Sequence, residues 1–142
     1  MVEVNLKQRL EQIKFEEKLK DKYSDFPGIK SYRLFFGKEL TKPELDATKG
    51  ITKINSIPSE KIMRDGNRDR NCDWVTVKLQ PYLNCQDEFI IGDVAVILGN
   101  PMLFLKNHLK DSCDIRIIHR NAGKLFMVLE TEYFLEFFIK DI

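Results

Sequence analysis

The side chains that could bind a metal or act as nucleophiles are few and widely spaced. They are three cysteines, Cys72, Cys85 and Cys113, and two histidines, His108 and His119. An odd number of distant cysteines without a CxxC pair does not fit a zinc module or a disulfide framework. Cys113 and His119 lie six residues apart on one expected strand, which is too far for a nucleophile–base pair. We therefore expect reduced, semi-buried thiols and no metal site.

The sequence also lacks the motifs of common enzyme classes. It contains no GxSxG elbow, no glycine-rich phosphate loop ending in Lys-Ser or Lys-Thr, and no HExxH. Glu130, Glu132 and Glu136 could be read as paired carboxylates, but a solvated strand edge is the better explanation. We predict a protein that is not an enzyme, with no catalytic residues and no cofactor.

Basic and aromatic residues offer binding chemistry instead. The net charge is only +1, yet residues 49–70 and 106–124 each carry an excess of three positive charges, whereas residues 130–142 are acidic. Lysine and arginine release counterions from nucleic acids, and aromatic rings stack on bases. The candidate nucleic-acid contacts are Lys61, Arg64, Arg68, Arg70, Trp74, Lys78, Lys106, Lys110, Arg116, Arg120 and Lys124, with Tyr82 and Phe104 as further stacking candidates. A merely solvated loop and core packing of the rings are the alternatives.

The first element that must position these residues is a helix predicted over residues 3–23. Leu6, Leu10 and Ile13 recur at helical spacing, and "SDFPG" then ends the helix because Pro27 lacks a donor. The apolar stripe needs a partner, either the domain body or a second copy of the chain.

A strand or extended arm at "YRLFF" and a short helix follow. Thr41 and Glu44 form a capping box with Pro43 in the first turn, and Gly50 is suited to end the helix. The segment "MRDGNRDRN" has no sustained period and is expected to be an exposed loop.

From Asp73 onward the pattern is typical of strands. Val75, Val77 and Leu79 alternate with polar residues, and turn signals separate the later apolar runs. The expected strands are 73–80, 94–98, 113–119, 124–130 and 133–139, the third and fourth forming a hairpin that ends its loop at Gly123. Short strands at this spacing favour a sandwich or a small barrel.

The length of 142 residues and the apolar content of 43% indicate one domain with appendages. No run of about 18 apolar residues exists that could cross a bilayer. We expect a soluble protein without a membrane partner that stays inside the cell.

Four segments of the chain, taken in order, resemble the conserved internal domain of the minichromosome maintenance protein ten family. The members of this family are eukaryotic replication-initiation factors. The segments are "FPGIKSYRLFFGKELTKPELDATKGITKINSIPSEKI", "DWVTVKL", "IGDVAVILGNP" and "DIRIIHRNAGKLFMV". The resemblance spans roughly residues 26–139 and places "DWVTVKL" on the strand that opens an OB-fold barrel. Leu98, Asn100 and Pro101 match the Leu-Asn-Pro with which the family's later strand ends, but here one extra residue, Gly99, lies between the leucine and the asparagine.

The resemblance implies a mainly β (α+β) fold: a small OB-like barrel, incomplete in strands, with an N-terminal amphipathic helix and a short capped helix. Residues 1–25 would be the helix, 26–72 an arm, short helix and basic loop, and 73–142 the OB-like domain. It also implies a nuclear accessory factor of DNA replication that binds single- and double-stranded DNA. The implied partners are the replicative helicase, the priming polymerase and the sliding clamp.

The alternative is a protein-interaction module that docks a partner through the N-terminal helix and the apolar tail, without nucleic acid. Self-association through that helix belongs to the same hypothesis.

Overall fold

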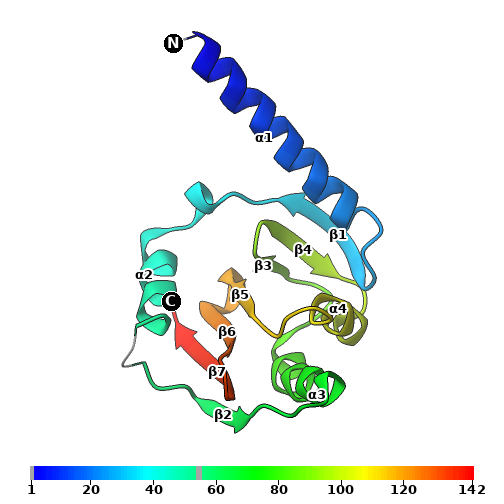
Figure 1. Ribbon diagram of the computed structural model, residues 1–142, viewed down its shortest axis with the longest axis vertical. Coiled ribbons are helices and arrows are strands. Elements are labelled where there is room, and N and C mark those ends of the chain that lie inside the picture. Colours follow the sequence, from blue (N-terminus) through cyan, green and yellow to red (C-terminus); the bar gives the residue numbers. More distant parts are fainter. Residues whose placement is uncertain (1, 54–55) are drawn as a thin grey trace.

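A computed structural model describes residues 2–53 and 56–142 and shows an α+β fold built on one antiparallel sheet (Figure 1). The strands are β1 (Ile29–Leu34), β2 (Glu60–Met63), β3 (Glu88–Ile91), β4 (Val94–Leu98), β5 (Ile115–His119), β6 (Lys124–Glu130) and β7 (Phe134–Asp141). The α-helices are α1 (Val2–Tyr23), α2 (Lys42–Ile51), α3 (Arg68–Leu79) and α4 (Pro101–His108). The strand order is β1-β4-β3-β5-β6-β7-β2, so β1 and β2 are the two edges of a 7-stranded sheet. The predicted α+β class is confirmed.

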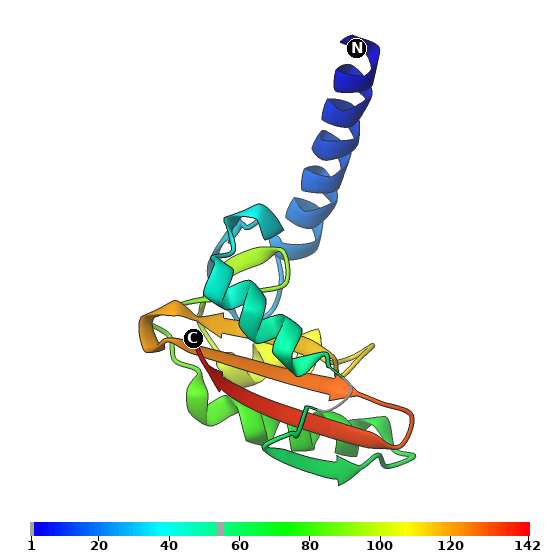
Figure 2. The same ribbon diagram turned by 90° about the vertical axis from the view of Figure 1, so that its left-hand side faces the viewer.

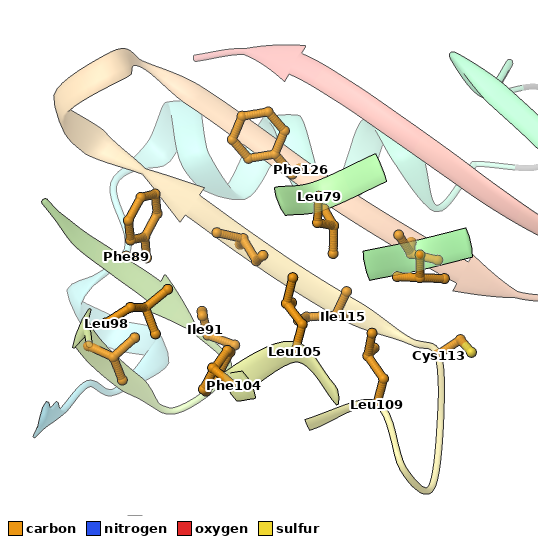
Figure 3. Close-up of a cluster of buried hydrophobic side chains, with 14 of the residues drawn as sticks. Leu79, Phe89, Ile91, Leu98, Phe104, Leu105, Leu109, Cys113, Ile115 and Phe126 are labelled. Carbon is orange, nitrogen blue, oxygen red and sulfur yellow. The ribbon is translucent and has the colours of Figure 1, made fainter. Parts of the chain in front are cut away.

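Helices cover both faces of this sheet. The sheet curves around α3 and α4, while α2 packs on the opposite face and α1 projects away from the body (Figures 1 and 2). On the α3/α4 face, Phe89 and Ile91 of β3 meet Leu79 of α3 and Phe104 and Leu105 of α4 (Figure 3). On the other face the core residues are Phe35, Ile51, Ile90, Ala95, Ile118, Leu125 and Phe138. The central strands are therefore apolar on both sides.

Several predicted elements are confirmed with small changes of boundary. The helix predicted over 3–23 is α1, and the predicted hairpin is β5–β6, with Gly123 in the turn at φ 61°. The capping box begins α2: Thr41 Oγ1 accepts from Glu44 N (3.3 Å), and the Glu44 carboxylate accepts from Thr41 N (2.9 Å). The strands predicted at 94–98 and 133–139 are β4 and β7.

The strand predicted at 73–80 is wrong, because this segment is helical and belongs to α3. Asn67 caps the helix by accepting from the backbone N of Asp69 (2.9 Å) and of Arg70 (3.4 Å). Val75 and Leu79 are 0% exposed, but Val77, which a strand would place beside them, is 64% exposed. Helical spacing thus buries two of the three residues, and capping and packing override the β preference of the valines.

Three further elements were not predicted. The expected loop at "MRDGNRDRN" begins with the last residue of β2 and ends inside α3; its residues are exposed as expected except Asn71, which is buried. β3 lies in a segment where the sequence pattern predicts no strand. The "GNP" turn is the start of α4, where Asn100 Oδ1 accepts from Leu103 N (3.1 Å) and Pro101 occupies the first turn.

Residues 26–72 supply both edge strands, and residues 73–142 supply the five inner strands and α4. Within the described ranges, no helix is long and apolar enough to span a membrane.

Gly28 joins β1 to the start of α4. Its φ is 84°, and its carbonyl accepts from Gly99 N (2.8 Å) and Asn100 N (3.1 Å). A Cβ at this position would lie 2.5 Å from Phe104 N and 2.6 Å from Asn100 O, so no larger residue fits.

We therefore expect Gly28→Ala to lower the free energy of unfolding by about 2–3 kcal/mol in urea titrations. Gly50→Ala is the control, since nothing lies within 4 Å of its added methyl group in α2. That variant should gain about 0.5–1 kcal/mol. Unchanged stability of Gly28→Ala would contradict the tight junction.

Candidate functional site

Two of the predicted DNA-contacting arginines converge on one half-buried carboxylate. Arg64 Nη2 lies 3.6 Å and Arg68 Nη1 lies 3.7 Å from Glu130 Oε1, and the Glu130 side chain is only 14% exposed. Arg64 Nη1 also donates to the Thr131 carbonyl (2.9 Å), and Arg68 Nε donates to the Lys110 carbonyl (2.7 Å). The two arginines thus hold β2 and the start of α3 against the β6–β7 turn. We call Arg64, Arg68 and Glu130 the arginine clamp.

Four more of the candidates form ion pairs within the domain. The pairs are Arg70–Asp65 at 3.3 Å, Lys78–Glu60 at 2.6 Å, Arg120–Glu44 at 2.8 Å and Lys124–Asp141. Arg120 makes two hydrogen bonds to Glu44, which is 3% exposed, and these bonds lower the pKa of the Glu44 carboxyl group. The guanidinium of Arg120 also lies over the Phe35 ring, 5.1 Å from its centroid. These contacts reduce the positive charge available to a polyanion.

The remaining basic candidates do not form one basic face. Lys61 Nζ lies over the Phe134 ring, 4.7 Å from its centroid. Arg116 is half-buried on β5, and its Nε atom has no hydrogen-bond partner among the described residues. Lys106 and Lys110 line a shallow cavity of about 380 Å³ between α3 and α4, together with Asp69, Cys72 and Asp73. The Arg68–Lys110 bond brings the two basic runs of the sequence together there, but with acidic residues between them.

The predicted stacking rings are used mainly for packing. Phe104 is 0% exposed in the core, so it cannot stack on a base, and this prediction is wrong. Tyr82 is 40% exposed but already stacks on Phe126, with 4.6 Å between ring centroids. Trp74 is half-buried on α3, with Lys78 Nζ 5.7 Å from its ring centroid.

The cysteines and histidines form no joint site. Burial raises the pKa of the Cys113 thiol to about 11 and lowers the pKa of His108 to about 4, so both are neutral near pH 7. His119, 7% exposed, pairs through Nε2 with Asp87 (2.8 Å) rather than with Cys113. Within residues 2–53 and 56–142, no group of three His, Cys, Asp or Glu side chains is arranged to hold a metal ion.

The Asp87–His119 pair was not found from the sequence. The Asp87 carboxylate also accepts from Asn84 Nδ2 (3.0 Å) and from Asn121 Nδ2 (3.0 Å), and these bonds lower its pKa. The network joins the loop before β3 to the β5–β6 turn. Only the local Asn84–Asp87 turn had a signal in the sequence, because the other contacts join residues more than 30 positions apart.

The N-terminal helix has an apolar stripe that the domain leaves exposed. Its C-terminal part docks through Tyr23, which is 4% exposed, and through Leu19, whereas Leu6, Leu10 and Ile13 are 57%, 52% and 49% exposed. At 3.6 residues per turn, the Leu6–Leu10–Ile13 stripe lies roughly 130° around the helix from the docked residues. The helix cannot therefore bury both sets against the body. We call residues 5–14 the distal segment.

Comparison with known protein families, with curated proteins and with solved structures finds no match to this chain. The described residues offer two candidate surfaces: a mostly ion-paired set of basic residues and an exposed helical stripe.

The arginine clamp makes a prediction about stability. Glu130→Gln removes the charge that neutralises two guanidinium groups, and we expect the free energy of unfolding to fall by roughly 1–3 kcal/mol. The matched control is Glu132→Gln, an exposed residue of the same turn, which should change stability by less than about 0.5 kcal/mol. Equal effects of the two variants in urea unfolding would show that the clamp does not hold β2 in place.

Proposed function

We propose that the protein is a non-enzymatic binding module and that the distal segment of α1 docks a partner protein. The single observation that carries this proposal is the exposed Leu6–Leu10–Ile13 stripe on a helix that leaves the body (Figure 2). In proteins, most of the stability of a helix comes from packing its apolar face against another surface. The exposed stripe of α1 is therefore expected to pack against a partner.

Beside the distal segment the charges that border the stripe are positive: Lys7 and Lys14 lie on one side and Arg9 lies on the other, while Glu11 lies on the far side of the helix. Glu17, one turn after Ile13, adds a negative charge where the stripe ends toward the body. A complementary surface is an apolar groove with an acidic rim, as in helix-in-groove recognition.

The test begins with a photoreactive amino acid at position 10, which identifies the partner by crosslinking. The identified partner is then titrated against the wild type, Leu10→Asp and the control Gln8→Asp. Gln8 lies nearly opposite the stripe, so both variants add the same charge but only one adds it to the docking side. We expect Leu10→Asp to weaken binding about 10–100-fold and Gln8→Asp to leave it unchanged, because burying a leucine contributes about 1.5–3 kcal/mol.

Both side chains are exposed, so neither variant should change the melting temperature. Equal losses for the two variants, or no loss for Leu10→Asp, would remove the distal segment as the docking element.

A second candidate function is weak DNA binding, as the family resemblance implies. It is favoured by one observation, the Arg68 Nε–Lys110 O hydrogen bond of 2.7 Å, which brings both basic runs to one side of α3 and α4. An open, curved antiparallel sheet is compatible with an incomplete OB-like barrel, although "DWVTVKL", the segment expected to open that barrel, lies in α3. On this hypothesis the protein would be a nuclear replication factor that contacts the helicase, the priming polymerase and the sliding clamp.

Fluorescence anisotropy of a labelled single strand of about 25 nucleotides, at low and near-physiological salt, tests this candidate. Lys106→Ala/Lys110→Ala is the informative variant, because it leaves the arginine clamp intact. If both amines contact phosphates, binding should weaken and the slope of log K against log salt should flatten by about 0.7 per contact. Absence of saturable binding at low salt would exclude this surface and leave the helix proposal untouched.

A further inference from the structure

The two edges of the sheet differ in how well they are protected. β1 lies beside the base of α1, where Tyr23 and Tyr32 are in ring contact, and it carries Lys30 and Arg33. β2 pairs with β7 on one side and has no neighbour on the other within the described residues, as the lower end of Figure 1 shows. Proteins usually shield such an edge with charges or a covering element, because its free N–H and C=O groups invite another strand.

β2 carries the charges of Glu60 and Lys61, but no element of the described residues covers it, and exposed apolar side chains gather at this edge. Among the described residues, six of the ten exposed large apolar side chains outside α1 belong to β2 or to segments near it: Ile57, Ile62, Met63, Val77, Tyr82 and Tyr133. Met63 is 71% and Tyr133 63% exposed, and the Tyr133 carbonyl accepts from the backbone N of Arg64. Val77 and Tyr82 line a groove of about 340 Å³ beside Glu60 of β2. Neighbouring strand residues such as Ile62 and Met63 point to opposite faces, so apolar side chains are exposed on both faces of this edge.

The hydrogen-bond pattern fixes how an incoming strand would attach. Arg64 N donates to Tyr133 O (2.8 Å), which extends the Glu60↔Phe137 to Met63↔Phe134 register of β2 and β7 by one residue. In an antiparallel ladder the bonding groups of successive residues point to opposite sides. Ile62 and Arg64 therefore turn their backbone groups toward β7, and Lys61 and Met63 turn theirs outward. A new strand must bond to these two residues.

The residue pattern of β2 is complementary to itself. When the segment "EKIMR" (residues 60–64) meets a second copy antiparallel about Ile62, Lys61 of each copy bonds to Met63 of the other. Ile62 then faces Ile62, and Glu60 faces Arg64 of the second copy. Shifting the register to centre on Lys61 would place two lysines directly opposite each other, which is destabilising.

The ion pairs within each chain could join into one network across this contact. Glu60 is paired with Lys78 and its side chain remains 50% exposed, while Arg64 is paired with Glu130 and remains 34% exposed. Across two copies the sequence Lys78, Glu60, Arg64 and Glu130 alternates in sign on the α3 side. Such a network of charges is more stabilising than an isolated surface pair.

We infer that β2 is the pairing edge of a symmetric dimer of this chain, in which the two sheets join as one antiparallel sheet. The strand that pairs with this edge is a second copy of the chain. The register that lets the outward backbone groups bond also places opposite charges of residues 60–64 against each other. This inference is independent of the role of the distal segment of α1.

The first test is covalent. In a Cys85→Ser background, which removes the exposed native thiol, Ile62→Cys should form an intermolecular disulfide under mild oxidation. In this register Ile62 faces Ile62 as a non-hydrogen-bonded pair, whose Cα atoms lie about 4.5 Å apart, which suits a disulfide. The control Val77→Cys is exposed near the same edge but off the two-fold axis, and it should crosslink far less.

The second test uses proline. Met63→Pro removes an outward N–H and leaves the β7 ladder intact, whereas Ile62→Pro removes a bond to β7 and should destabilise the fold. By sedimentation velocity across a concentration series, we expect the wild type to dimerise and Met63→Pro to be monomeric with a nearly unchanged melting temperature.

All measurements are repeated with Leu10→Asp, so that association through α1 is separated from pairing through β2. A monomeric wild type at every concentration would overturn the inference. A dimer that survives Met63→Pro and fails to crosslink through Ile62→Cys would overturn it as well, and its loss on Leu10→Asp would assign it to α1.

Discussion

The fold depends on one constraint: the central strands must be apolar on both faces, because helices cover the sheet on both sides. Phe89 and Ile91 of β3 turn to the α3/α4 face, while Ile90 between them turns to the α2 face. A double-faced sheet leaves few places for charged groups near its centre. The ion pairs accordingly lie at the ends of strands and in the turns, where Arg120 meets Glu44 and where the arginine clamp closes on Glu130.

The same constraint explains which elements could be predicted from the sequence. "VAVIL" and "KLFMVLE" are dense in β-branched and large apolar residues and are bounded by turn signals, so β4 and β6 were identified. α2 was identified because the Thr41–Glu44 capping box is a local signal. α3 was misjudged because Val75, Val77 and Leu79 satisfy a strand pattern as well as a partly buried helix. Only the Asn67 cap and the burial of Val75 and Leu79 in the core beside α4 decide between the two.

The candidate surfaces show the same limit. The apolar stripe on α1 follows from helical spacing and was predicted, but its exposure could not be, because the spacing does not say whether the domain body covers it. The state of the arginines could not, since Glu130 is more than 60 positions from Arg64 and Arg68, and Glu44 is 76 positions from Arg120. A basic run in a sequence shows how many positive side chains a segment carries. The ion pairs formed in the fold determine how many of those side chains are free to bind a ligand.

The length of α1 determines how far from the domain body a partner of the distal segment would lie. Leu6 precedes the docked Leu19 by thirteen residues, which in an α-helix places it roughly 20 Å further from the body. β2 lies at the end of the molecule away from this helix (Figure 1). Two chains joined at β2 would therefore carry two helical arms at their outer ends. Such an assembly is bivalent, and a partner with repeated or clustered sites would be held by avidity rather than by the strength of one contact.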